Sequence, residues 1–387
     1  MQTIESSTKL ARDLVQGCFQ CGVCSGACPK SHVQPEFLPR RLVLDVVGGK
    51  KDRLLNSGIV WECLTCGLCH SLCPMHLGLM GFIRDLRCEM VEKGVHCVPA
   101  HENVVGPYTA ILADSRSRPR RRHLFKDDLR IAPSENHDIL YFSGCLPYYA
   151  VEFSPDVGFE GMNIAYNTVR LLNAIDIEPA IFDSEKCCGH DALWRGEKQQ
   201  FISLMNQNLD YLTKYDKIVV SCSECLRTFS KDYEEFGGTS LKVEYIGTLL
   251  ADQLDRFSIP VKDDSELITF HDSCRLGRHM GIYEEPREVL THFGFKLKEM
   301  ASSREESHCC GVTAFIQCDE LNKKIRRERM TEAVDTGAHR LVTPCPKCQI
   351  HLKCLQNDRS EPQKYEIEII DFVSLLAERL PEEGEAE

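Results

Sequence analysis

Short apolar runs alternate with longer amphipathic stretches from about residue 138 onward. The runs at 139–142 and 218–220 are apolar throughout, as in strands that are buried on both faces. The stretches 196–215 and 319–336 repeat apolar residues at helical spacing and predict amphipathic helices. Because strands that alternate with helices favour a parallel sheet, we expect this part of the chain to be α/β.

The first part of the chain has a different pattern. One stretch with helical spacing, residues 38–55, lies between two cysteine-rich runs. We expect residues 1–97 to form a helical head and the proline-rich residues 98–137 to form a linker. The arginines of this linker are expected either to be solvated or to pack against an acidic neighbour. They are Arg116, Arg118, Arg120, Arg121 and Arg122.

The remainder of the chain is an internal duplication. Four segments match at offsets of 122 to 129 residues: "DILYFSGC" with "LITFHDSC", "KCCG" with "HCCG", "KIVVSCSEC" with "RLVTPCPKC", and "YIGTLLADQL" with "IDFVSLLAERL". We expect two homologous domains, residues 138–262 and 263–387. Since homologous units tend to pair through equivalent faces, a pseudo-twofold axis is expected to relate them.

Composition narrows the class of protein. The formal net charge of −12 argues against nucleic-acid binding and against binding to an anionic membrane surface. We find no apolar leader and no run of about 18 apolar residues, so we expect neither an export signal nor a membrane span. The 22 cysteines then indicate metal ligation in a reducing compartment. We expect a cytoplasmic protein, which a partner could hold at the cytoplasmic face of a membrane.

Two cysteine runs in the head repeat the pattern C-x2-C-x2-C-x3-C-P. They comprise Cys18, Cys21, Cys24 and Cys28, and then Cys63, Cys66, Cys69 and Cys73. In this pattern three close thiolates hold one cubane [4Fe–4S] cluster and the fourth reaches the other cluster. We therefore expect Cys73 to join the first three ligands and Cys28 to join Cys63, Cys66 and Cys69. Zinc is the alternative, although zinc sites take four ligands in two pairs.

The two copies of the duplication each carry five cysteines at equivalent places. The first CCG set is Cys145, Cys187, Cys188, Cys222 and Cys225; the second CCG set is Cys274, Cys309, Cys310, Cys345 and Cys348. Adjacent cysteines suit an extended cluster better than one compact ion. Zinc or an inert relic remains the alternative for each copy.

The head, with its "WECLTC" before the second run, resembles the C-type subunit of heterodisulfide reductase. The duplicated "CCG" part resembles the B-type subunit, and the whole order resembles the D-type fusion. That resemblance implies a ferredoxin-like head, an α+β fold overall, and a non-cubane [4Fe–4S] cluster in each CCG set. It also implies that the ten CCG cysteines are catalytic in disulfide reduction. The iron–sulfur subunits of glycolate oxidase and of anaerobic glycerol-3-phosphate dehydrogenase share the layout.

The expected function is therefore a heterodisulfide reductase-like oxidoreductase subunit. The alternative is a pure electron relay for a flavoprotein dehydrogenase or a bifurcating complex. We find neither a G-x-G-x-x-G nor a Walker A motif, so we expect no flavin, NAD or ATP site in this chain. By resemblance, the partner in a hetero-oligomeric complex is an A-type flavoprotein, a hydrogenase or formate dehydrogenase module, or a membrane cytochrome b. One departure, "CCGVTAF" after the second set, is bulkier than the family's pattern and bears on the substrate.

Residues near the motifs receive weaker expectations. Loop residues His190, Val312 and Phe315 are expected to line a cavity between the copies and to affect substrate choice more than stability. Lys347 is expected to be a solvated residue at a helix start, or to lower the energy of a thiolate or hold an anionic substrate. His190, His271 and His308 are expected to support the clusters or to deliver protons. Four cysteines outside both patterns are expected to be buried apolar residues. They are Cys88, Cys97, Cys318 and Cys354.

Overall fold

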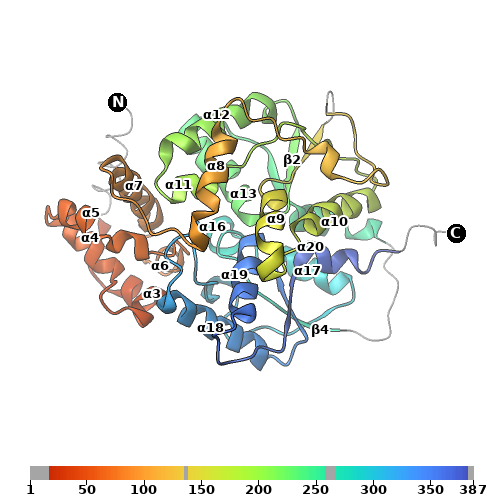
Figure 1. Ribbon diagram of the computed structural model, residues 1–387. Coiled ribbons are helices and arrows are strands. Elements are labelled where there is room, and N and C mark those ends of the chain that lie inside the picture. Colours follow the sequence, from red (N-terminus) through yellow and green to blue (C-terminus); the bar gives the residue numbers. More distant parts are fainter. Residues whose placement is uncertain (1–16, 135–137, 258–265, 382–387) are drawn as a thin grey trace. The chain divides into compact units, whose positions relative to one another are not determined.

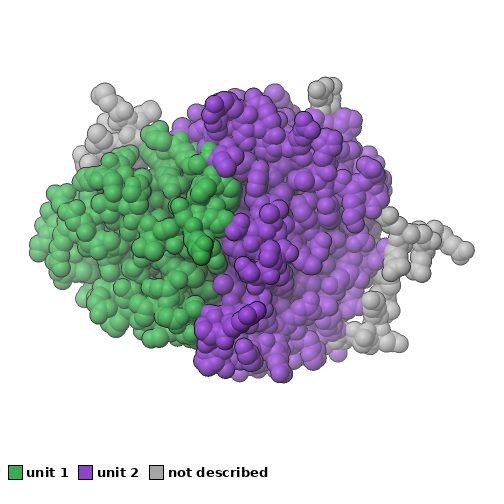
Figure 2. All heavy atoms as spheres, viewed as in Figure 1, with its two compact units in different colours: residues 1–110, 189–201, 308–329 green, residues 111–188, 202–307, 330–387 purple. Residues whose placement is uncertain are grey.

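A computed structural model describes residues 17–134, 138–257 and 266–381 of the chain. The chain divides into two compact units, which Figure 2 colours separately. Unit 1 comprises residues 1–110, 189–201 and 308–329, and unit 2 comprises residues 111–188, 202–307 and 330–387. Of the helices in the described residues, none is both long enough and apolar enough to cross a membrane.

The head in unit 1 is helical, as expected. Its helices are α2 (Val23–Gly26), α3 (Pro29–Val33), α4 (Pro39–Val47), α5 (Lys51–Ser57), α6 (Leu68–Ser71) and α7 (Leu79–Glu92). The single helix predicted over 38–55 is wrong, because the chain breaks between α4 and α5. Gly48 ends α4, and Gly49 has a φ of 72°, which only glycine adopts at little cost. The helical spacing of the apolar residues continues across this break, which is why the pattern suggested one helix.

Two segments from the duplicated part of the sequence also belong to unit 1. Residues 189–201 include α11 (His190–Trp194), which packs against α7. Residues 308–329 follow the second "CCG", and Ile316 from this segment lies in the apolar core of the head. The same segment bonds to the chain after the head, since Phe315 O accepts from Ala100 N at 2.8 Å.

Unit 2 contains two parallel sheets, which confirms the α/β prediction. The first sheet has the order β1-β2-β3 and the second has the order β5-β4-β6-β7. The strands are β1 (Ile139–Phe142), β2 (Lys217–Val220), β3 (Val243–Tyr245), β4 (Leu267–Phe270), β5 (Lys296–Leu297), β6 (Arg340–Thr343) and β7 (Glu368–Asp371). The strand registers match between the copies, so that Val220 opposite Tyr245 corresponds to Thr343 opposite Asp371.

The packing of helices in unit 2 is reciprocal between the copies. Helix α10 (Gly161–Ala174) of the first copy packs on α20 (Phe372–Ala377) of the second. The equivalent helices exchange roles, because α17 (Glu285–His292) of the second copy packs on α15 (Ile246–Ala251) of the first. Figure 1 shows α10 beside α20. This exchange is the packing that the predicted pseudo-twofold axis requires.

The remaining helices connect these elements. They are α8 (Val105–Ala113), α9 (Leu146–Val157), α12 (Lys198–Leu212), α13 (Ser223–Arg227), α14 (Tyr233–Gly237), α16 (Gly277–Met280), α18 (Glu320–Asp335) and α19 (Pro346–Asn357). Helix α8 falls in the segment 98–137 that we expected to be a linker.

Candidate metal centres

The first head site is the group of cysteines that surrounds one apolar hollow in the head. It consists of Cys18, Cys21, Cys24 and Cys73. Gly22 has a φ of 87° and begins α2, so the chain turns sharply between the second and third cysteines. The structure thus brings the last cysteine of the second run beside the first three of the first run, as the crossed pattern predicts.

The second head site surrounds a neighbouring hollow. It consists of Cys28, Cys63, Cys66 and Cys69. Burial, and after it the thiols of Cys66 and Cys63, raise the pKa of Cys28 to about 12. Thr65 N donates to Cys63 Sγ at 3.3 Å, a contact of the kind that tunes iron–sulfur potentials. Cys69 also lines the first hollow, so the two head sites adjoin.

The two head sites differ in their exposure to solvent. Cys21 of the first site is exposed, whereas the equivalent Cys66 of the second is buried. Large apolar side chains beside the first site are also exposed: Phe19 by 61%, Met75 by 47% and Val23 by 41%. The first head site is therefore the one that an outside molecule can approach.

The thiols of the first CCG set form one continuous chain of contacts in unit 2. Cys145 Sγ lies 3.0 Å from Cys187 Sγ. Hydrogen bonds from Cys187 and Cys225 lower the pKa of Cys188, and Cys225 is also hydrogen-bonded to Cys222. A lowered thiol pKa favours the thiolate, which is the form that binds metal. The five residues thus fit a metal cluster in both proximity and chemistry.

Local structure explains why these five cysteines converge. Cys145 and Cys222 each follow the carboxyl end of a parallel strand, where ligand sites of α/β sheets lie. Gly144, with a φ of 63°, lets Cys225 Sγ approach to 3.3 Å of the position that a β-carbon would take. The "CC" pair is held by its backbone, since Asn208 donates to Cys187 O at 2.9 Å and Tyr233 donates to Cys188 O at 3.0 Å.

A buried carboxylate braces the first set. Glu185, which is fully buried, accepts from Ser143 Oγ at 2.7 Å and from Gly144 N at 2.8 Å. Burial raises the pKa of Glu185 to about 7, although Arg121 opposes this shift. Arg121 is 1% exposed and stacks over Tyr148 at 5.0 Å. This arginine of the predicted linker therefore packs against an acidic neighbour, while Arg116 is exposed and pairs with Asp114.

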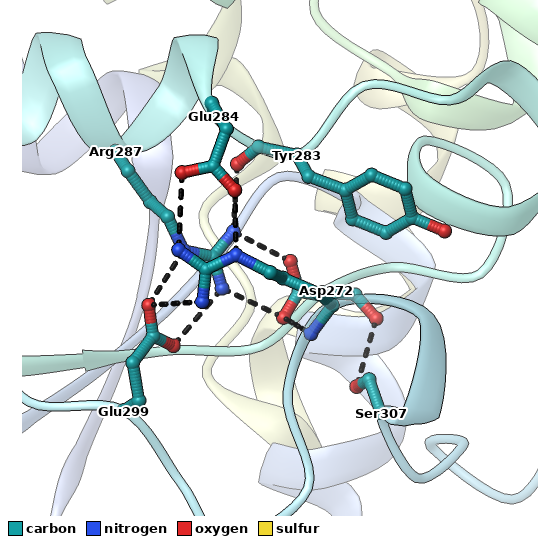
Figure 3. A network of polar contacts seen from close by, with 7 residues as sticks. Asp272, Tyr283, Glu284, Arg287, Glu299 and Ser307 are labelled. Carbon is teal, nitrogen blue, oxygen red and sulfur yellow. Dashed lines mark hydrogen bonds and ion pairs between the residues drawn. The ribbon is translucent and has the colours of Figure 1, made fainter.

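The second CCG set is braced by the same positions with their chemistry exchanged. Asp272 stands where the first copy has Ser143, and Ser307 stands where it has Glu185. Ser307 Oγ donates to Asp272 O at 3.3 Å, and Arg287 binds the Asp272 carboxylate at 2.8 and 2.9 Å. Figure 3 shows Arg287 between Asp272 and Glu299. The turn that precedes Cys274 is thereby fixed.

The cysteines of the second set are distributed over both units. Cys274, Cys345 and Cys348 belong to unit 2, whereas Cys309 and Cys310 belong to unit 1. Cys345 and Cys348 begin α19 as Cys222 and Cys225 begin α13.

The two CCG sets meet at equivalent cysteines. Hydrogen bonds from Cys222 and then Cys348 lower the pKa of Cys345 well below its ordinary value. Cys222 and Cys345 are the first cysteines of the two C-x-x-C pairs, so the contact lies on the pseudo-twofold axis. The strand ends of the two copies therefore face each other in unit 2.

Within unit 1 the loops after both "CCG" motifs are bonded to the second head site. Arg87 donates to Trp194 O at 3.0 Å and to Cys63 O at 2.5 Å. Thr65 Oγ1 lies 2.9 Å from Thr313 Oγ1. These two contacts join each loop to the backbone that carries Cys63 and Cys66.

Two expectations for individual residues are wrong. Phe315 is fully buried and packs edge-on against His101 at 5.9 Å, so it serves stability and not substrate choice. Lys347 is only 2% exposed, and its Nζ lies 2.6 Å from Glu224 Oε2 in an ion pair. It is therefore neither solvated nor free to hold an anionic substrate. Spacing gave no signal for Glu185, since neither it nor its partner Ser143 belongs to a recognisable motif.

The remaining named residues fit apolar or supporting roles. Cys88 is buried, and burial raises its pKa to about 12, which indicates an inert thiol. Cys318 lies 2.9 Å from Arg326 Nη2 in unit 1. His190 is 2% exposed and His271 is 1% exposed, so both are interior residues.

Comparison with known proteins agrees with this geometry. The cysteine-rich domain family CCG matches residues 139–230 and 268–353, and the 4Fe-4S dicluster domain matches residues 14–77. This chain is a CCG-domain iron–sulfur protein. The CCG-domain protein is 28% identical to the D-type subunit of the dihydromethanophenazine:CoB–CoM heterodisulfide reductase of Methanosarcina barkeri, over 95% of this chain and 78% of the relative.

Other relatives of this CCG-domain protein are also oxidoreductases. It is 28% identical to the B-type subunit of the CoM/CoB fumarate reductase of Methanothermobacter marburgensis, over 88% of this chain and 68% of the relative. It is 30% identical to the EtfAB:quinone oxidoreductase of Syntrophomonas wolfei, over 46% of this chain and 27% of the relative. The domains and these relatives fit an oxidoreductase subunit that relays electrons or reduces a disulfide.

Proposed function

We propose that this protein carries electrons through two cubane [4Fe–4S] clusters in the head to two non-cubane clusters in the CCG sets, where a disulfide is reduced. The observation that carries the proposal is the contact between Cys222 and Cys345, which joins the two CCG sets. Iron–sulfur clusters supply one-electron transfer when bound. Cleavage of a disulfide takes two electrons and two protons and yields two thiols, so two adjacent one-electron centres match the chemistry.

We assign each cluster its own ligands. The first and second head sites each provide four thiols, in the crossed arrangement. The five thiols of the first CCG set provide one non-cubane site, and the duplication implies the same role for the second set. Apolar hollows lined by converging thiols support the head assignment. The chain of thiol contacts from Cys145 to Cys222 supports the assignment of the first CCG set.

Electrons are proposed to enter at the first head site, because it is the exposed one. The donor would be another redox subunit: an A-type flavoprotein, a hydrogenase or formate dehydrogenase module, or a membrane cytochrome b. The apolar rim of Phe19, Val23 and Met75 suits a protein surface that excludes water on docking.

The second candidate is an electron relay without a substrate site. It is favoured by the buried Thr65–Thr313 contact, which ties the loop after the second "CCG" to the head. In that case electrons would leave for a quinone or a bifurcating module on a partner.

Anaerobic assay with a reduced viologen as donor separates the two candidates. Disulfide reduction predicts that the heterodisulfide of coenzymes M and B is consumed, with two viologens oxidised for each disulfide. Cys222→Ser should abolish this consumption, whereas Cys88→Ser, at a buried cysteine outside the sets, should not. If viologen reduces the clusters fully and no disulfide is consumed, the relay candidate stands.

A further inference from the structure

The middle of each C-x-x-C pair holds an opposite charge in the two copies. Glu224 lies between Cys222 and Cys225, and Lys347 occupies the same position between Cys345 and Cys348. A twofold axis places equivalent residues opposite each other, so identical charges here would repel. The duplication has instead diverged to one acid and one base.

The two charged groups meet inside unit 2. Lys347 Nζ lies 2.6 Å from Glu224 Oε2, and the side chains are 3% and 11% exposed. Next to this pair, Ser223 Oγ lies 2.9 Å from Ser273 Oγ, which joins the first C-x-x-C segment to the turn before Cys274. The hydroxyl contact therefore adds a second link between the copies.

A third equivalent pair extends the same axis. Tyr245 and Asp371 occupy matching registers and are each 1% exposed. Their mutual influence is direct, because burial and then the Asp371 carboxyl raise the pKa of Tyr245. Polar residues at the axis are thus matched in pairs, and Glu224–Lys347 is the pair with full opposite charges.

We propose that the Glu224–Lys347 ion pair is a positioning element that holds the two C-x-x-C segments together and so sets the separation of the two CCG clusters. The proposal rests on the proposed function, in that it requires a cluster in each CCG set. A buried charge that loses its partner is strongly unfavourable, and two like charges at this place would push the segments apart. Since each segment begins a helix and carries two ligands, movement of one segment displaces two thiols at once.

The pseudo-symmetry offers a charge-reversal test. Single variants E224K and K347E each place like charges at the axis, and each should lose the iron of the CCG sets, about half of the total for four equal clusters. The double variant E224K/K347E restores an ion pair and should regain the wild-type iron content. It should also regain the magnetic coupling between the two reduced CCG clusters, measured by electron paramagnetic resonance.

A matched control is the ion pair of Lys217 and Glu244, which has the same 2.6 Å length but side chains that are 42% and 19% exposed. K217E should leave both iron and coupling unchanged. If E224K alone keeps wild-type iron and coupling, the positioning role is refuted. The same follows if the double variant binds all its iron but shows no coupling. If the wild type itself holds no iron in the CCG sets, the proposed function fails instead.

Discussion

Replacement of Arg87 by methionine tests how the head is joined to the loop after the first "CCG". Arg87 is fully buried, and its guanidinium binds the carbonyls of Val60, Trp61, Cys63 and Trp194. Methionine keeps an apolar stem of similar length but donates no hydrogen bond. Each hydrogen bond from a charged donor contributes about 1.5–3 kcal/mol, and each of the two terminal nitrogens makes at least one. We therefore expect a loss of about 3–5 kcal/mol.

Tryptophan fluorescence under anaerobic urea unfolding measures this loss. The chain has two tryptophans, and both contact Arg87: its guanidinium lies 5.3 Å from the Trp61 ring centroid and bonds to Trp194 O. At a urea dependence of about 1–3 kcal/mol per molar, the midpoint should fall by more than about 1 M. Arg53→Met, at an exposed arginine of α5, is the control and should change stability by less than about 0.5 kcal/mol. An Arg87→Met shift as small as that of the control would refute the reasoning.

Three further variants test other contacts. Cys73→Ser should remove the electron paramagnetic resonance signal of the first head site and leave the second; loss of the second alone would mean that the ligands are not crossed. Gly311→Ala should lower the thermal midpoint more than Gly94→Ala, because both glycines have positive φ but only Gly311 would place a β-carbon 2.7 Å from Asn322 O; equal effects would leave strain alone as the cause. In Thr65 and Thr313, each single change to valine orphans a buried hydroxyl and should cost about 1–3 kcal/mol, whereas the double change should cost less than the sum; an additive result in urea unfolding would deny the contact.

The regular parts of the fold were predictable because their signals are local. The run Ile139–Phe142 is a strand with the predicted bounds, and its parallel pairing follows from the alternation with helices. The repeat of cysteine spacings brought Cys73 to the first head site without any structural information.

The rest depends on contacts between residues that are distant in the sequence. Nothing near Thr313 indicates that it meets Thr65, which lies 248 positions earlier. Likewise, the alignment of the copies placed Glu224 opposite Lys347 in register, but only the folded chain brings the two charges together. The helix break at Gly49 was missed because the apolar spacing on both sides is consistent with one helix.

Metal analysis of the complete chain tests the central claim most directly. The complete chain is required because residues 189–201 and 308–329 cluster with the head, so a fragment that begins at residue 138 would lack their partner. Anaerobically purified protein should contain about sixteen irons with matching sulfide and no zinc, from four clusters of four. Serine at Cys187, Cys222, Cys309 and Cys345 together should reduce this to about eight irons. About eight irons in the wild type, with zinc present and no change in the quadruple variant, would contradict the account.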